Sequence, residues 1–448
     1  MPNELLVIGG GLAGCEAACK AAELGVAVRL IDMKPHQFSP AHHDPRLGEL
    51  VCSNSLRSAE ATSAVGLLKT EMALMGSAVM AAARATAVPA GKALAVDRGA
   101  FAAWLDAAVS DHPLITREAR RFDALPRAGL TVVATGPLTA EALAADLRSL
   151  TGAGHLHFYD AIAPIVSAES VDMDRAFWAD RWADDDAVAG DYLNCPLERE
   201  EWEAFYAALT TAAQVPLKQF ETPRFFEGCL PIEVMASRGE KTLLFGPMKP
   251  VGLKDPRTGR RAFAVVQLRK EDAQGRLLNL VGFQTKLTYP AQEQVFRLIP
   301  ALRNAEFARL GSIHRNTFVD APRVLTPDCR LIAAPHLIIA GQLSGVEGYV
   351  ESAASGLFCG LMAARSLRGQ PVILPPPTTA LGGLLGHLQN AAAKDFQPSN
   401  VNWGLLPPWP ERAPKKERPR LLARRALADY LAWLAELGLT PAEAPPEV

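Results

Sequence analysis

The N-terminal segment LLVIGGGLAGCEAACKAAELGVAVRLID constrains the fold of this 448-residue chain more than any other stretch. An apolar run at 5–8 precedes the spacing G-x-G-x-x-G, an alanine-rich helical pattern follows, and a second apolar run at 26–31 ends on Asp32. In such a βαβ unit the glycines allow a tight turn against a pyrophosphate, the helix N-terminus attracts negative charge, and the acidic residue accepts hydrogen bonds from a ribose. The segment therefore predicts a dinucleotide site at Gly9, Gly10, Gly11, Leu12, Ala13, Gly14 and Asp32.

Two later segments extend the same predicted sheet. LTVVATGP, residues 130–137, is typical of a buried strand that ends at a turn, and residues 336–367 read as a strand, a glycine-rich turn and a long apolar helix. A C-terminal unit of this kind that returns to an N-terminal nucleotide unit is typical of FAD-binding domains, where the second helix start points at the flavin ring. We expect further cofactor contacts from Thr135, Gly136, Gly341, Gln342, Gly345 and Glu347.

Between these units the composition changes. Residues 171–315 are richer in Pro, Trp, Phe and charge, and short alternating segments such as AFAVVQLRKED predict strands. The expected fold is α/β: a Rossmann-like FAD-binding domain made of residues 1–170 and 316–448, with an inserted smaller α+β domain at 171–315 that binds substrate or tRNA. No second glycine motif with its strand and helix follows, so a built-in nicotinamide domain is not expected.

The composition and the N-terminal residues indicate where in the cell the protein acts. Hydrophobic residues make up 49% of the chain, yet no run of about 18 uncharged apolar residues predicts a membrane span. The N-terminus lacks the basic region of a secretory signal. Seven cysteines without metal-type spacing indicate free thiols. We therefore expect a cytoplasmic protein with no metal site and no membrane association.

Two basic segments stand out on a chain whose net charge is −2. Residues 238–270 hold nine Lys or Arg against two acidic residues, and residues 411–425 hold seven against two. Each segment alone is as compatible with a solvated face as with a binding surface. Together they favour an anionic partner.

Two of the seven cysteines lie in unusual surroundings. Cys52, in ELVCSNSLRSAE, is followed by small polar residues and Arg57, which suit a reactive thiol better than a buried one. Cys229, in FFEGCLPIEVMA, lies between a glycine and a proline that predict a loop. The others are expected to be structural: Cys15, Cys19, Cys195, Cys329 and Cys359.

These segments resemble the folate- and FAD-dependent tRNA (uracil-5-)-methyltransferase family, which makes ribothymidine in the T loop of bacterial tRNA. The resemblance covers residues 8–405 and rests on GGGLAGCEAA, ELVCSNSLRS, FFEGCLPIEVMA, GPMKPVGL, GFQTKLTYPAQ, GSIHRNTF, AGQLSGVEGYVESAASG and NVNWGL. It implies that methylenetetrahydrofolate supplies the carbon, FAD the electrons, and NADH or NADPH the means to re-reduce the flavin. The implied target is the uridine at position 54 in the T arm, without an obligatory protein partner.

The resemblance also assigns roles to the two cysteines. A thiolate that adds to carbon 6 of uracil makes carbon 5 nucleophilic, and a base must then remove the carbon-5 proton. The family has two catalytic cysteines, which match Cys52 and Cys229. We expect Cys229 to be the nucleophile and Cys52 the base, although the two roles can be exchanged on sequence alone. Ser53, Asn54 and Arg57 would keep Cys52 ionisable.

The remaining assignments concern the two substrates. His314 offers a ring for stacking a pterin, and Arg98 could meet a phosphate or carboxylate of flavin or folate; a histidine at the domain seam and a surface helix start are the ordinary alternatives. The target uridine must leave the T-loop stack to react. The residues expected to contact tRNA are Arg57, Lys249, Lys254, Arg257, Arg260 and Arg261.

Three other functions compete with this interpretation. The wobble-uridine tRNA-modifying flavoproteins share the fold but are considerably longer, with a helical C-terminal domain. A nicotinamide–flavin reductase without an RNA substrate is disfavoured because the chain lacks a second nucleotide fold. A flavin-bound tRNA chaperone would need neither Cys52 nor Cys229 for its activity.

Overall fold

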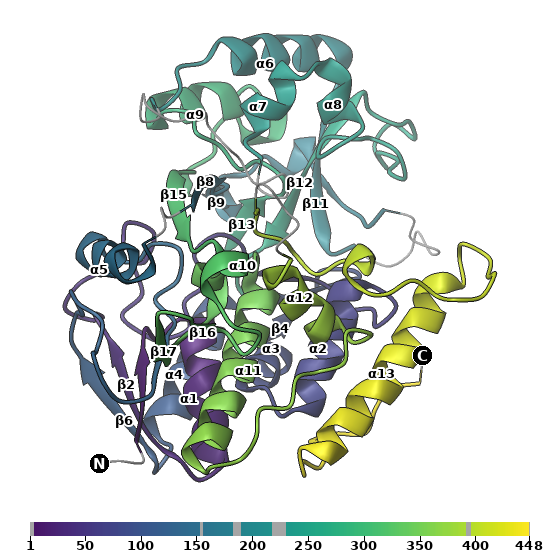
Figure 1. Cartoon of the computed structure of the whole chain (residues 1–448). Coiled ribbons are helices and arrows are strands. Elements are labelled where there is room, and N and C mark those ends of the chain that lie inside the picture. The colour runs from purple at the N-terminus through teal and green to yellow at the C-terminus, as the bar shows by residue number, and fades with distance from the viewer. Residues whose placement is uncertain (1–3, 153–155, 182–189, 217–229, 391–395, 448) are drawn as a thin grey trace.

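The computed structural model describes residues 4–152, 156–181, 190–216, 230–390 and 396–447. Figure 1 shows a large lower region that holds both ends of the chain and a smaller upper region built from its middle. The two regions have separate hydrophobic cores, one drawn from the two ends of the sequence and one from residues 166–305.

The lower region is organised around a six-stranded sheet with the order β16-β17-β7-β1-β2-β6. Five strands run parallel and β16 is antiparallel to β17, as in doubly wound nucleotide-binding folds. The runs expected at 5–8, 26–31, 130–137 and 336–340 all form strands of this sheet. The bounds are β1 Glu4–Ile8, β2 Ala27–Asp32, β6 Ile115–Ala119, β7 Thr131–Val133, β16 Arg330–Leu331 and β17 Ala334–Ile339.

Helices cover this sheet, and two of them pack unusually closely. On α11, a side chain added at Gly356 or Gly360 would overlap the backbone of Ala13 or Ala17 on α1. The glycines let α11 lie against the first helix and beside the nucleotide-type loop. The helices are α1 Leu12–Glu23, α2 Ala64–Leu74, α3 Ala78–Ala85, α4 Arg98–Ser110, α5 Glu141–Thr151, α10 Ala321–Val324, α11 Tyr349–Leu367, α12 Ala380–Leu388 and α13 Arg418–Glu436.

The upper region contains a second six-stranded sheet, ordered β10-β11-β12-β13-β9-β14, in which every neighbouring pair is antiparallel. Its strands are β9 Ile165–Ser167, β10 Phe177–Trp178, β11 Tyr192–Leu197, β12 Ala264–Lys270, β13 Leu277–Leu280 and β14 Phe307–Arg309. The helices of this region are α6 Arg199–Thr211, α7 Ile232–Ser237, α8 Glu240–Leu244 and α9 Tyr289–Phe296.

An antiparallel pair, β8 Leu156–Ala161 with β15 Ile313–Phe318, lies where the chain passes between the regions. The inserted domain was expected to cover residues 171–315. Strand β9 of the second sheet lies before residue 171, and strand β15 continues past residue 315. A three-stranded sheet, β3 Ser55–Ser58, β5 Ala93–Val96 and β4 Ala87–Val88, supports the segment after Cys52. The predicted fold class, a Rossmann-like FAD-binding domain with a smaller α+β insertion, is confirmed.

Within the described residues, no single helix is long and apolar enough to cross a membrane. The helices α2 and α3 reach the required length and composition only as a pair, and they meet at 108°.

Candidate functional site

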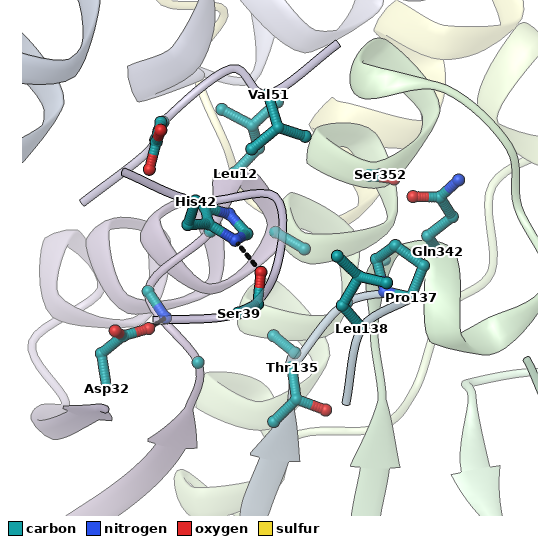
Figure 2. Close-up of a pocket in the computed structure, with 18 of the residues that line it drawn as sticks. Leu12, Asp32, Ser39, His42, Val51, Thr135, Pro137, Leu138, Gln342 and Ser352 are labelled. Carbon is teal, nitrogen blue, oxygen red and sulfur yellow. Dashed lines mark hydrogen bonds between the residues drawn. The ribbon is translucent and has the colours of Figure 1, made fainter. Parts of the chain in front are cut away.

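A cleft opens at the carboxyl ends of β1, β2 and β7, where ligands bind in open parallel sheets. It contains about 930 Å³ of space that is free of protein atoms, including its open mouth. Figure 2 shows its lining residues converging from the first helix, the loop after β2, the turn after β7 and the start of the second glycine-rich turn. Ten residues expected to bind a cofactor line it: Gly9, Gly10, Gly11, Leu12, Ala13, Asp32, Thr135, Gly136, Gly341 and Gln342.

The glycine loop is shaped for a ligand that approaches its backbone. A Cβ at Gly14 would lie 1.8 Å from the carbonyl oxygen of Gly9, whereas a Cβ at Gly11 would meet no protein atom within 4 Å. Gly14 therefore closes the turn, and Gly11 faces open space. The first turn of α1 has no capping side chain and no acidic residue, so its N–H groups and its positive dipole end remain available to an anion. This cradle fits a dinucleotide pyrophosphate.

Asp32 connects the two sides of the nucleotide-type unit. Its carboxylate accepts hydrogen bonds from the N–H of Gly10 at 2.6 Å and from the N–H of Lys34 at 2.8 Å. Both contacts leave lone pairs on the carboxylate, which lies on the cleft wall. The arrangement suits a ribose hydroxyl.

On the opposite wall of the cleft, some of the residues predicted to contact the cofactor line the cleft and others lie behind it. Gln342 lines the cleft and donates to buried Glu347 at 2.6 Å. Burial, followed by the neighbouring Asp160 carboxylate, raises the pKa of Glu347 well above its usual value. Gly345 packs near Phe396. Gly345 and Glu347 do not line the cleft, and Glu347 is joined to it by its hydrogen bond with Gln342.

The cleft also contains a pair that the sequence did not indicate. The ring nitrogen Nδ1 of His42 lies 2.6 Å from the hydroxyl of Ser39, as Figure 2 shows. Burial lowers the pKa of His42, which favours the neutral ring. Neither residue lies in a recognisable spacing, because the loop that carries them follows the βαβ unit without a regular pattern.

Cys52 lies at the edge of this cleft, next to Val51, which lines it. The N–H of Cys52 donates to the phenolic oxygen of Tyr349 at 2.6 Å, and Tyr349 also lines the cleft. Arg309 donates to the carbonyl oxygens of Val51 at 2.9 Å and Cys52 at 3.3 Å. The backbone on both sides of the thiol is thus held by side chains from α11 and from the inserted domain.

Two guanidinium groups, those of Arg98 and Arg309, interact electrostatically with the Cys52 thiol. Arg98 forms a 2.6 Å ion pair with Glu271 and is not among the residues that line the cleft. Burial, followed by the nearby charge of Arg98, lowers the pKa of Arg309. Glu271, the partner of Arg98, and Glu347, which also interacts with the thiol, add carboxyl groups to these surroundings.

Arg57, expected to supply this positive charge, is engaged elsewhere. Its guanidinium pairs with the fully buried carboxylate of Glu351, and its backbone has a φ of 63°. The carbonyls of Leu56 and Arg57 accept hydrogen bonds from buried Lys69, whose pKa burial lowers to about 8. Arg57 therefore holds the loop after Cys52 against α11, a contact that competes with the expected one to tRNA.

Ser53 and Asn54, which were expected to keep Cys52 ionisable, form hydrogen bonds with the inserted domain. Arg269 of the inserted domain donates to the side-chain oxygens of Asn54 at 3.0 Å and Ser53 at 2.8 Å. Buried Asn54 in turn donates to the carbonyls of Val96 and Lys270. Ser53 and Asn54 join the two domains here and lock the cysteine loop between them.

The remaining six cysteines differ in burial where the structure describes them. Cys229 lies outside the described residues. Cys15, Cys195, Cys329 and Cys359 are buried free thiols, and Cys19 is partly buried. Burial raises the pKa of Cys19 and that of Cys195 to about 12, so these thiols are protonated at neutral pH.

A second cleft, between the loop at 40–43 and the inserted domain, contains His314. It also includes Arg309, His43, Tyr289 and Phe307. The Nε2 atom of His314 lies 3.0 Å from the Ser312 hydroxyl, and burial, followed by nearby His42, lowers the pKa of His314. A neutral ring in a cleft with aromatic neighbours suits stacking.

The basic residues of the inserted domain form an exposed loop between α8 and β12. Lys254, Arg260 and Arg261 are exposed, and Lys249 is partly so. Arg257 differs, because it pairs with Asp255 at 2.6 Å and also donates to the carbonyl of Asp174. Arg257 shapes the loop, and the other four present charge to solvent.

The fold and the cleft define a Rossmann-like dinucleotide-binding protein of the flavoprotein type. The family model described as glucose inhibited division protein A matches residues 4–371. The chain is 55% identical to a methylenetetrahydrofolate–tRNA-(uracil-5-)-methyltransferase TrmFO of Desulfotalea psychrophila over 96% of each chain, and 55% identical to one of Geobacter sulfurreducens over 97% of this chain and all of that one. The chain therefore belongs to the methylenetetrahydrofolate–tRNA-(uracil-5-)-methyltransferase family and is an enzyme, as the sequence predicted.

A solved structure supports the fold independently. Aquifex aeolicus GidA in its form II crystal superposes with a TM-score of 0.68 at 15% identity, over 97% of this chain and 74% of that one.

Proposed function

We propose that the protein methylates carbon 5 of the T-loop uridine at position 54 of tRNA, with methylenetetrahydrofolate as carbon donor, FAD as bound cofactor and NADH or NADPH as reductant. Relatives that are 52–55% identical are named methylenetetrahydrofolate–tRNA-(uracil-5-)-methyltransferases, which supports the reaction type and both substrates. Similarity over nearly the whole length supports a common site. A cytoplasmic location without an obligatory protein partner accords with this role.

The glycine loop and α1 would hold the FAD pyrophosphate, and Asp32 a ribose hydroxyl. Thr135, Gly136, Gly341 and Gln342 would contact the rest of the cofactor from the facing wall. When bound, FAD supplies the two electrons that take the methylene carbon to a methyl group.

The two cysteines would act on the uracil ring. Cys229 would add to carbon 6, and carbon 5 would then bond the methylene carbon. Cys52 would next take the proton from carbon 5, and the bond between Cys229 and carbon 6 would break when the methylated uracil is released. Arg98 and Arg309 place positive charge beside Cys52, and the Tyr349 hydrogen bond fixes its backbone. The reverse assignment of the two cysteines remains a variant of the same proposal.

His314 would stack on the pterin of the folate, with Arg309 and His43 beside it. Arg98 would support this site through Glu271 and the Cys52 loop. Lys249, Lys254, Arg260 and Arg261 would contact tRNA phosphates, with Arg257 and Arg57 shaping the surfaces next to them. The uridine would be flipped from the T loop to reach the cleft.

The observation that carries the proposal is the position of Cys52: its backbone is bonded to Tyr349, on the wall of the cofactor cleft. The test combines purified protein, unmodified tRNA transcript, methylenetetrahydrofolate labelled at its methylene carbon, and NADH or NADPH. Labelled 5-methyluridine in the T loop, abolished in Cys52→Ala and in Cys229→Ala, is expected. Nicotinamide oxidation without any label in tRNA would favour a reductase instead.

A further inference from the structure

The second basic segment forms an exposed surface on the C-terminal helix. Six cations of residues 411–425 are exposed, in the loop before α13 and on its first two turns: Arg412, Lys415, Lys416, Arg418, Arg420 and Arg424. We call these six residues the C-terminal basic surface. In the part of the chain that the structure describes, no ion pair joins any of them to a carboxylate.

The support beneath this surface is rigid. The opposite face of α13 is buried in the main core through Leu422, Ala423, Ala426, Leu427, Tyr430, Trp433 and Leu434. Arg425 turns away from the surface and donates to the carbonyls of Pro407 and Pro408. Trp433 donates to the carbonyl of Ile373 at 3.1 Å. The cations on α13 therefore extend from a helix whose opposite face is packed against the core.

Their position opposes helix stability. The N-cap of α13 is Glu417, whose side chain makes no capping hydrogen bond, and the first turn contains Arg418 and Arg420 but no acidic residue. Cations at a helix N-terminus repel its positive dipole end, so this arrangement weakens the isolated helix. An anion bound there would be attracted by both the side chains and the dipole.

The chain between Val401 and Arg412 connects the C-terminal basic surface to the neighbourhood of the Cys52 loop. The N–H of Val401 donates to Glu351 at 2.9 Å, and Glu351 pairs with Arg57 in the loop that follows Cys52. Arg412 lies eleven positions after Val401, so the surface starts within about 40 Å of that cluster even if the chain is fully extended. A folded RNA whose loop enters the cleft carries phosphates along its whole length and has many within this reach.

We propose that the C-terminal basic surface binds phosphates of the substrate RNA outside the reacting loop. The proposal rests on the proposed function, and it adds a contact surface to the loop at 249–261. A membrane surface fits less well, because the apolar face of α13 is already buried and leaves nothing to insert. In Figure 1 the start of α13 lies at the edge of the lower region, on the side opposite α5.

The test measures the affinity of the full-length FAD-loaded protein for unmodified tRNA transcript by fluorescence anisotropy, from 50 to 300 mM KCl. The variant Lys415→Gln/Lys416→Gln/Arg420→Gln/Arg424→Gln is expected to bind at least tenfold more weakly at the lowest salt. The slope of log Kd against log salt should fall by about 0.7–0.9 for each phosphate that the variant no longer neutralises. Lys415→Gln/Lys416→Gln, which lies ahead of the helix, should show part of the effect without disturbing α13.

The matched control for Arg420→Gln/Arg424→Gln is Arg127→Gln/Arg148→Gln, two exposed arginines at and beside α5. This control should keep the wild-type slope. Equal slopes and affinities for the basic-surface variants and the wild type would overturn the inference while leaving the proposed function intact. Loss of binding to anionic vesicles with unchanged tRNA binding would overturn it in favour of a lipid. A wild-type protein without any affinity for tRNA would overturn the proposed function as well.

Discussion

The N–H of Cys52 donates to the phenolic oxygen of Tyr349 at 2.6 Å, although the two residues are 297 positions apart. The same oxygen lies 3.4 Å from the N–H of Ser53. Tyr349 is the first residue of α11 and lines the cofactor cleft, so one side chain connects that cleft to the cysteine loop. Burial raises the pKa of Tyr349, which keeps it a neutral phenol at physiological pH.

Tyr349→Phe should lower methyl transfer while FAD remains bound. The substitution removes one hydroxyl and leaves a half-buried N–H without its acceptor, which costs about 1–3 kcal/mol, or roughly 5- to 150-fold if the whole cost falls on the reaction. Single-turnover formation of labelled 5-methyluridine measures the rate, and flavin absorbance measures the cofactor. Tyr206→Phe, which removes a 2.9 Å bond to the Ala236 carbonyl in the inserted domain, is the control. Equal rates in both variants would refute the role of Tyr349.

Arg309→Gln should make Cys52 less reactive toward iodoacetamide at neutral pH, about three- to tenfold. The substitution removes one of two cations near the thiol and weakens the hold on the Val51 and Cys52 carbonyls. Arg309→Lys keeps the charge and should recover part of the rate. Peptide mass spectrometry in a Cys229→Ala background follows Cys52 alone.

Arg323→Gln is the control for that experiment, because Arg323 is 73% exposed and pairs with Asp320 away from the cysteine loop. A reactivity of Cys52 that is the same in Arg309→Gln, Arg309→Lys and the wild type would show that Arg309 does not support the thiolate.

Gly11→Ala should yield a folded protein that retains little of its flavin. A Cβ there meets no protein atom, so only a ligand in the cleft can oppose it. Gly14→Ala should fail to fold properly, because its Cβ would overlap the Gly9 carbonyl oxygen. The control is Gly386→Ala, at an exposed position on α12 with open space around it, which should keep both fold and flavin. The ratio of flavin to protein absorbance after purification, with circular dichroism for the fold, decides the result. Full flavin content in Gly11→Ala would contradict the cofactor position.

The sequence predicted where the cleft lies, because the determinants of its position are local. Gly9, Gly14 and Asp32 lie within one βαβ unit, and the geometry of that unit follows from residue spacing. The second half of the cleft was also predictable, because Gly341 and Gln342 follow a recognisable strand. Ser39 and His42 were missed, since nothing in an irregular loop marks them.

The surroundings of Cys52 were predicted only in part, because they are made by tertiary contacts. Arg309 approaches the loop from 257 residues away, and Arg269 from more than 200, so no spacing rule could reveal either. Arg57 lies close to Cys52 in sequence, but its guanidinium pairs with the buried carboxylate of Glu351. A buried charge must be paired, and this need outweighs sequence proximity.

Glu71 should make stability depend on pH. This carboxyl is fully buried in α2 and accepts hydrogen bonds from the N–H groups of Ala380 and Leu381, at 2.7 and 2.8 Å, where α12 begins. Burial raises its pKa from 4.5 to about 8. Between these two values the folded protein holds a proton that the unfolded chain has released, so the contribution of Glu71 to stability is complete below pH 4.5 and is lost as the pH rises through 8.

Glu71→Gln removes this titration and replaces it with a constant loss of one acceptor. Its thermal midpoint should therefore lie furthest below that of the wild type at the lowest pH tested, pH 5.5, and approach it by pH 8.5, with a change of at most about 1.4 kcal/mol per pH unit. Differential scanning fluorimetry of both proteins at three pH values gives the difference directly. Glu60→Gln, at a half-exposed surface pair with Lys92, should show a difference that does not change with pH. A constant difference for Glu71→Gln across the same range would mean that Glu71 is already ionised in the folded protein, held as an anion by the two N–H groups of α12.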